Sequence, residues 1–156
     1  MDTLDPAEMT RLYGDVEAVV RALAVPAARG KAAPRLIELF RSVDDPSGLG
    51  MRWAIGSTLE VVGDDSVADD LKALATDPKY GQARQMVVLG LGRLKSTRAE
   101  DVLIDLLKDE DVVGHAAVAL GKRRSERAAP AISGLLQHPK PWVRKEAMKA
   151  LAKIQG

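Results

Sequence analysis

No cysteine occurs among the 156 residues, which excludes disulfide bonds, thiolate metal sites and a cysteine nucleophile. Aromatic residues make up only 3% of the chain, and its apolar residues are mostly Ala, Leu and Val. Small aliphatic side chains favour close packing of helices over a β-sandwich, which is rich in aromatic and β-branched residues. The composition therefore predicts an all-α protein.

Long apolar runs are missing as well. No stretch approaches the ~20 apolar residues needed to cross a bilayer. The first residues, MDTLDPAEM, have neither the basic segment nor the apolar core of a secretory signal. A hydrophobic fraction of 46% is nevertheless enough for a sizeable core. We therefore expect a single cytoplasmic domain over residues 1–156, with no membrane among its partners.

The net charge of +1 hides an uneven distribution. Residues 1–78 carry 8 Lys and Arg against 14 Asp and Glu, whereas residues 79–156 carry 15 against 8. In an elongated molecule, this difference predicts one acidic end and one basic end.

The first helical pattern has a clear start. Asp5 is a good N-cap, Pro6 suits the first helical position, and Glu8 completes a capping box. Its apolar stripe consists of Met9, Leu12, Val16, Val19, Val20 and Leu23. Because a stacked repeat protein must shield its first core layer, we expect residues 1–26 to form an N-terminal capping helix.

From residue 34 onward, two helical patterns alternate. The first helices align at Leu36, Leu71, Leu103 and Ile132, and the second helices align at Leu59, Leu91, Leu120 and Leu151. Both series recur about every 30 residues, which is typical of a helical solenoid. We therefore expect residues 34–156 to form four repeats, and the whole chain to be an α-α superhelix of about nine helices.

The second helices carry a recognisable pattern. Residues 112–122 and 143–154, VVGHAAVALGK and VRKEAMKALAKI, follow V-R-x-x-A-x-x-A-L-G after an acidic or proline-containing turn. In this pattern the chain resembles the HEAT-repeat family, specifically the short repeats of the phycobilisome-lyase type. The resemblance implies a solenoid whose second helices line a concave surface, and it fits scaffolds, enzyme subunits and nucleic-acid binders alike. Three residues depart from the pattern: Val113 replaces Arg, Glu60 a small residue, and Arg123 an aliphatic one.

Four glycines lie inside predicted helices, where each costs up to about 1 kcal/mol relative to Ala. They are Gly90, Gly92, Gly114 and Gly121. Close approach of neighbouring helix backbones would offset this cost. For Gly121, a helix C-cap is the alternative.

The second helices also supply a candidate binding surface. At positions where the last repeat has charged residues, the middle repeats have apolar ones, and an apolar strip in a groove favours recognition of a peptide or helix. The alternative is that superhelical twist buries these side chains between repeats. The predicted partner-binding residues are Trp53, Met86, Leu89, His115, Val118, Lys145 and Lys149.

The basic end supports a second hypothesis. Lys122, Arg123, Arg124 and Arg127 cluster in one turn, and Lys145, Lys149 and Lys153 recur every four residues on the last helix, with Trp142 at its start. Such a stripe suits the phosphates of a nucleic acid or another polyanion. The nearly neutral total charge instead favours a solvated cap on the last repeat, or an acidic protein partner.

Sequence signatures of catalysis are missing. His115 and His138 belong to different repeats, no HExxH pattern occurs, and no glycine loop follows a strand. We therefore expect a non-catalytic protein without a cofactor or a metal. The family resemblance alone would also allow an accessory subunit of a lyase-like complex. The oligomeric state is left open.

Overall fold

A computed structural model describes residues 6–47 and 49–156. The predicted N-cap Asp5 and the side chains of Glu8, Met9 and Leu12 lie outside this description. The α-helices are α1 (Pro6–Ala22), α2 (Ala33–Ser42), α3 (Met51–Val62), α4 (Ala68–Thr76), α5 (Gln85–Leu91), α6 (Thr97–Asp105), α7 (Val113–Arg123), α8 (Ala129–Gly134) and α9 (Pro141–Gln155). Short 3₁₀ segments are η1 (Pro26–Ala28), η2 (Asp65–Val67), η3 (Pro78–Arg84), η4 (Leu106–Lys108), η5 (Glu126–Ala128) and η6 (Leu135–Gln137).

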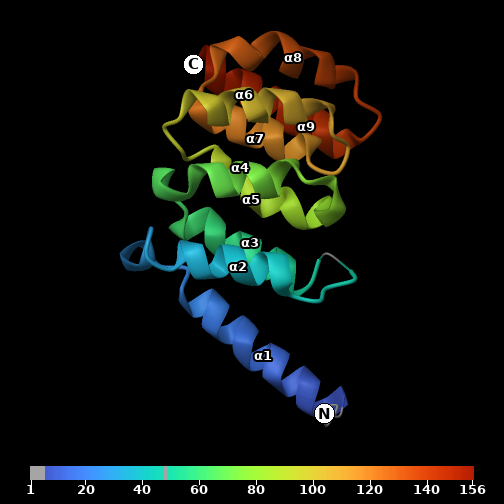
Figure 1. Cartoon of the computed structure of the whole chain (residues 1–156). Helices are drawn as coiled ribbons and strands as arrows, with labels where there is room; N and C mark the ends of the chain where they lie inside the picture. Colours follow the sequence, from blue (N-terminus) through green and yellow to red (C-terminus); the bar gives the residue numbers. More distant parts are fainter. Residues whose placement is uncertain (1–5, 48) are drawn as a thin grey trace.

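The helices after α1 form a stack of pairs. The first helices of the pairs are α2, α4, α6 and α8, and the second helices are α3, α5, α7 and α9; the second helices pack on one another in series. Figure 1 shows the stack rising from α2 and α3 to α8 and α9, with α1 leading away from its lower end. The described residues contain no strand. The predicted all-α superhelix of about nine helices is confirmed.

One continuous apolar core runs through the stack. The aligned residues of the first helices are all buried, and so are Leu59, Leu91 and Leu120 of the second helices. Leu151 of α9 is only partly buried. It lies in the last helix of the stack, which has a neighbouring second helix on one side only.

Glycines allow the second helices to approach closely, as predicted, although Gly92 is the C-cap of α5 and not a residue inside that helix. A Cβ atom added to Gly92 would lie 2.8 Å from the Cβ of Ala119, and one added to Gly121 would lie 2.7 Å from the Cα of Ala150. In each case the residue after the aligned leucine meets the residue before the aligned leucine of the next repeat. Gly121 lies inside α7, whose C-cap is the left-handed Arg124 with φ of 54°. The C-cap alternative for Gly121 is therefore wrong.

The same contact between α3 and α5 has its glycine on the other helix. Glu60 follows its aligned leucine, and Gly90 precedes the next one. A Cβ on Gly90 would lie 3.3 Å from the Cα of Glu60. The larger residue at position 60 is thus matched by a glycine on the opposite helix, which explains why Glu60 departs from the family pattern.

Among the described side chains of α1, only that of Val20, near the C-terminal end, is buried. Val20 is 2% exposed and Leu23 is partly buried, whereas Val16 and Val19 are 40% and 60% exposed. The Thr58 hydroxyl of α3 donates a hydrogen bond to the Val20 carbonyl at 2.9 Å. Of the described residues of the predicted apolar stripe, Val20 and Leu23 cover the first core layer, and Val16 and Val19 do not.

Candidate protein-binding surface

Arginines near the start of three second helices fix those helices against their own first helices. Arg52 donates to the Phe40 carbonyl at 2.8 Å and also to the Val43 carbonyl. Arg144 donates to the His138 carbonyl at 2.7 Å. These carbonyls end the first helix or its 3₁₀ extension, where no partner within the helix is available. The arginine of the V-R pattern thus sets the position of the second helix.

Arg84 does the same in its own repeat and also reaches into the next. It donates to the Ala75 carbonyl at 3.1 Å, and it contacts the carboxylates of Asp109 at 2.7 Å and Asp111 at 3.4 Å. Its side chain is only 1% exposed. Hydrogen bonds from Arg84 hold the pKa of Asp109 below its ordinary value of 3.8, although partial burial acts in the opposite direction. Arg84 therefore serves the turn of the repeat in which Val113 replaces the arginine.

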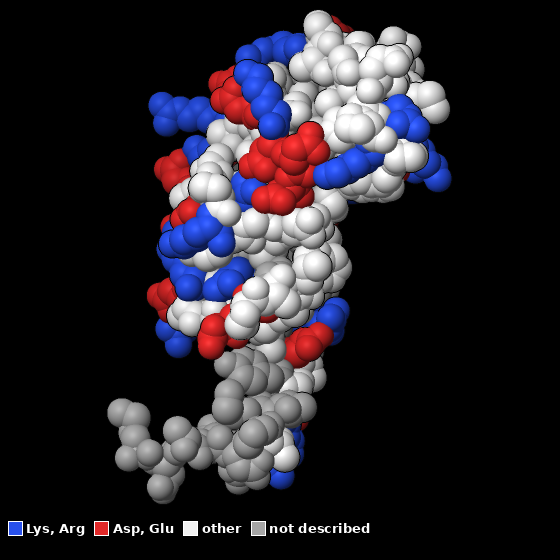
Figure 2. Space-filling view, turned by 90° about the vertical axis from the view of Figure 1, so that its right-hand side faces the viewer, with Lys and Arg blue, Asp and Glu red and all other residues white. Residues whose placement is uncertain are grey.

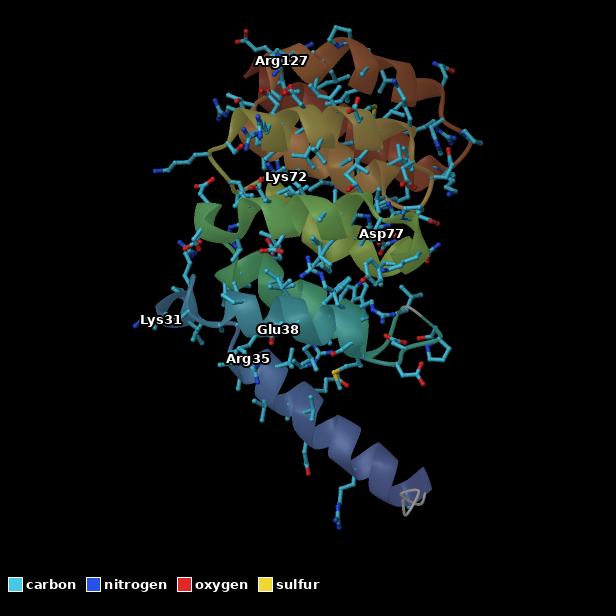
Figure 3. The ribbon with its side chains drawn as sticks, in the orientation of Figure 1. Lys31, Arg35, Glu38, Lys72, Asp77 and Arg127 are labelled. Atoms are coloured by element: carbon cyan, nitrogen blue, oxygen red, sulfur yellow. The ribbon has the colours of Figure 1, made fainter. Side chains whose placement is uncertain are left out.

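Two members of the predicted basic cluster join neighbouring repeats. Arg123 donates to the carbonyls of Leu94 and Ser96, which explains why it replaces an aliphatic residue. The Arg127 guanidinium lies 3.0 Å from the Glu100 carboxylate and 2.7 Å from that of Asp101. Figure 3 shows Arg127 beside the upper first helices. Much of this positive charge is thus offset within the protein.

The other basic candidates are exposed. Lys122 and Arg124 lie at the end of α7, and Lys145, Lys149 and Lys153 lie along α9. The Lys149 ammonium lies 2.9 Å from the Glu146 carboxylate. The stripe on α9 therefore reaches solvent as predicted, with one of its lysines paired.

The five apolar or aromatic candidates are partly buried, neither exposed nor in the core. They come from α3, α5 and α7 and comprise Trp53, Met86, Leu89, His115 and Val118. In Figure 2, charged side chains gather along the left-hand edge, the side of the first helices, and the right-hand part, the side of the second helices, is mostly uncharged. Superhelical packing thus covers the predicted strip in part.

Trp142 is a surface residue that the sequence placed only in the basic stripe. Its ring lies 5.1 Å from that of His115 and covers Gly114, on which a Cβ would lie 2.0 Å from the tryptophan Cζ3. The indole is 47% exposed. Gly114 occupies the position in its repeat that Lys145 occupies in the next. A glycine at a position where the next repeat has a long side chain was the signal that could have revealed this contact.

The environment of His115 keeps it uncharged at neutral pH. Burial lowers the pKa of His115 below its ordinary value of 6.5, and the Glu146 carboxylate opposes this effect only in part. With Trp142 beside it, His115 presents a neutral aromatic surface. The aromatic pair therefore extends the uncharged strip toward α9.

His138 lies elsewhere and has structural partners. Its Nε2 lies 3.0 Å from the Glu110 carboxylate, and its Nδ1 accepts a hydrogen bond from the Lys140 backbone N–H at 3.1 Å. Within the described ranges, no group of three or more His, Asp or Glu side chains could hold a metal ion. Nor is any described helix both long and apolar enough to span a membrane. What the surface offers is apolar, aromatic and cationic contact.

Comparison with known families agrees with this architecture. Residues 112–156 match the family described as HEAT repeats, and residues 83–109 match the PBS lyase HEAT-like repeat. No curated protein matches the chain. The matched segments contain α5, α7 and α9, which carry all the predicted binding residues except Trp53. Residues 83–109 and 112–156 thus carry HEAT-like repeats, one of them of the phycobilisome-lyase type, and the helix pairs from α2 to α9 repeat the same architecture.

Proposed function

We propose that this protein is a non-catalytic scaffold whose second helices bind an apolar peptide or helix of another protein. The observation that carries the proposal is a contrast within α3, α5 and α7. Each helix buries its aligned leucine completely, yet keeps at least one large uncharged side chain partly exposed. Covering such side chains stabilises a complex by about 25 cal/mol for each Å² of apolar surface removed from water.

The positive charges on α9 indicate where the ligand would carry negative charge. Lys145, Lys149 and Lys153 are exposed at the end of the uncharged strip. A ligand whose apolar residues contact Leu89 and Val118 would bring its flanking residues to these lysines. We therefore expect an apolar segment with acidic residues next to it, because complementary charge speeds association and fixes the register.

A library of short peptides tests this proposal directly. Peptides selected on the purified protein should be enriched in apolar residues next to Asp or Glu, and titration calorimetry should give their affinities. Leu89→Ser and Val118→Ser should each weaken binding about tenfold, since both remove apolar contact. Ala73→Ser is a matched control, because Ala73 is exposed on the first helix α4.

Two results would contradict the proposal. One is peptide binding that survives both serine substitutions. The other is a collapse of the melting temperature in Trp53→Ala and Leu89→Ala, because these side chains would then belong to the core.

Binding of a polyanion is the alternative that the exposed lysines favour. Duplex DNA should then be retained at low salt and released as the salt concentration rises. Replacing Lys145, Lys149 and Lys153 by Glu should abolish retention while leaving peptide binding through the apolar strip measurable. No retention at low salt would reject this alternative.

A further inference from the structure

Exposed large apolar side chains are concentrated near the two ends of the described stack. Val16, Val19 and Val25 lie at the α1 end, and Trp142 and Met148 lie on α9; Leu49, between α2 and α3, is the exception. At the α1 end, these side chains border a hollow that is distinct from the second-helix strip.

A groove of about 680 Å³ separates α1 from α2. Its walls are apolar and include Val16, Val19 and Leu23 from α1, and Leu36 and Leu39 from α2. Charged side chains of both signs, Asp15, Arg35 and Glu38, stand at its rim. Figure 3 shows Arg35 and Glu38 on α2 above α1.

The register of α1 shows what this groove lacks. Thr58 precedes the aligned leucine of α3, and its hydroxyl binds the Val20 carbonyl. In the contacts between the later second helices, the residue before the aligned leucine of one helix meets the residue after the aligned leucine of the preceding helix. Ala119, for example, meets Gly92. Val20 thus takes the place of Gly92 or Gly121, and Val19 takes the place of an aligned leucine.

Within the described residues, α1 is therefore a second helix without a first helix beside it. Leu59, Leu91 and Leu120 are at most 1% exposed, whereas Val19, in the equivalent place, is 60% exposed. Among the described elements, α1 packs mainly on α3. The groove is the vacant position of a first helix, and an occupant must be an amphipathic helix running antiparallel to α1.

A second copy of α1 meets these requirements. It is itself amphipathic, with exposed Val16 and Val19, and at 17 residues it is longer than the 10-residue α2. Two copies related by a two-fold axis place their α1 helices antiparallel, and each then fills the groove of the other. The rim carries both charges, as a surface that pairs with itself requires.

We propose that the protein forms a symmetric dimer through α1. In this dimer, α1 begins the row of second helices of its own chain and takes the place of the missing first helix beside α1 of the other chain. The contact buries Val16 and Val19 of both copies, and it leaves the second-helix strip and α9 accessible.

Two exposed residues provide a matched test. Val19 and Met148 are both 60% exposed, at opposite ends of the described stack. Light scattering after gel filtration should give a dimer for the wild type and for Met148→Glu. Val19→Asp should raise the dissociation constant at least tenfold, to about 100 μM or above, because it places a charge in the apolar contact. Circular dichroism should show unchanged helix content, since Val19 lies outside the core.

The absence of native cysteine allows a second measurement. Val19→Cys creates the only thiol of the chain, and in the symmetric dimer the two copies of residue 19 approach each other. Mild oxidation should therefore link most of Val19→Cys into covalent dimers, and little of Met148→Cys.

Other outcomes overturn the proposal. A monomeric wild type at about 100 μM would show that the groove does not bind a second copy. Loss of self-association in both Val19→Asp and Met148→Glu would show a head-to-tail contact instead. Neither variant alters a residue of the second-helix strip, so peptide binding is tested independently.

Discussion

The Arg84 guanidinium lies 2.7 Å from the Asp109 carboxylate across the boundary between two repeats. Arg84 is almost fully buried, and the same side chain also binds the carbonyls of Ala75 and Gly81. In the repeat that contains Asp109, Val113 occupies the position of the corresponding arginine. One arginine therefore joins the turns of two successive repeats.

Replacing Arg84 should destabilise the whole stack. Arg84→Met leaves two backbone carbonyls and the Asp109 carboxylate without their buried partner, and we expect the free energy of unfolding to fall by about 3 kcal/mol. Urea denaturation measures this change. Arg41→Met is the control, since the Arg41–Asp70 pair also joins two repeats but is roughly half exposed on both sides. Its loss should be below about 1 kcal/mol. Equal losses in the two variants would contradict the structural role of Arg84.

The same ion pair should make stability depend on pH. Because the pKa of Asp109 is lower in the folded protein than the ordinary 3.8, its ionised form stabilises the fold above that value. This contribution disappears as the pH falls through the lowered pKa. The stability difference between wild type and Asp109→Asn should be constant from about pH 7 to about pH 5 and should shrink below about pH 4. Asp105→Asn, at the exposed end of α6, controls for the loss of one negative charge.

The close helix contacts predict opposite effects for two glycine substitutions. Gly121→Ala should destabilise the protein by about 1–3 kcal/mol, because its Cβ would lie 2.7 Å from the Ala150 backbone. Gly14→Ala should stabilise it by up to about 1 kcal/mol, because no heavy atom lies within 4 Å and alanine favours a helix. Thermal unfolding compares the two. If Gly121→Ala were as stable as the wild type, the proposed reason for this glycine would be wrong.

A pair of substitutions tests the reversed contact found at Glu60. Gly92→Ala should be destabilising, because its Cβ would lie 2.8 Å from the Cβ of Ala119. Adding Ala119→Gly removes that atom and should restore part of the lost stability, as Gly90 accommodates Glu60 in the native protein. A double-mutant cycle in urea measures the coupling. Additive losses would mean that the two positions do not share this contact.

The neutral state of His115 can be observed directly. An NMR titration should give an apparent pKa of His115 below 6.5, and Trp142→Ala should raise it by exposing the imidazole. Since the unfolded chain binds this proton more readily, protonation of the unfolded state destabilises the fold as the pH drops below 6.5. His115→Gln should remove that part of the pH dependence. A titration at or above 6.5 would contradict the burial.

The stacked architecture was predictable because it repeats. Aligned leucines in two series specified both helices of each pair. Gly90, Gly92 and Gly121 were correctly assigned to close helix contacts, whereas Gly114 makes room for the Trp142 ring. These features depend on patterns that recur about every 30 residues, so each copy supports the interpretation of the others.

Features that occur once were harder to predict. The stripe of α1 looked like that of any buried helix, because a sequence pattern gives the apolar face of a helix but not whether another helix covers it. Likewise, the contacts of Arg123 and Arg127 depend on which carbonyls and carboxylates the preceding repeat brings near them. For the same reason, positions such as Trp53 and Leu89 turned out partly covered, between the two alternatives that the sequence left open.

The exchange of sizes between Glu60 and Gly90 limits how this chain can gain or lose repeats. The third repeat has Ala119 before its aligned leucine and Gly121 after it. If this repeat were duplicated, Gly121 of the first copy would meet Ala119 of the second, without a steric conflict. Removing the second repeat would instead set Glu60 against Ala119, with a side chain on both helices where the native chain has one. The first two repeats therefore form a matched unit that rearrangement must keep together, whereas the third repeat can be duplicated or removed without a conflict at this contact.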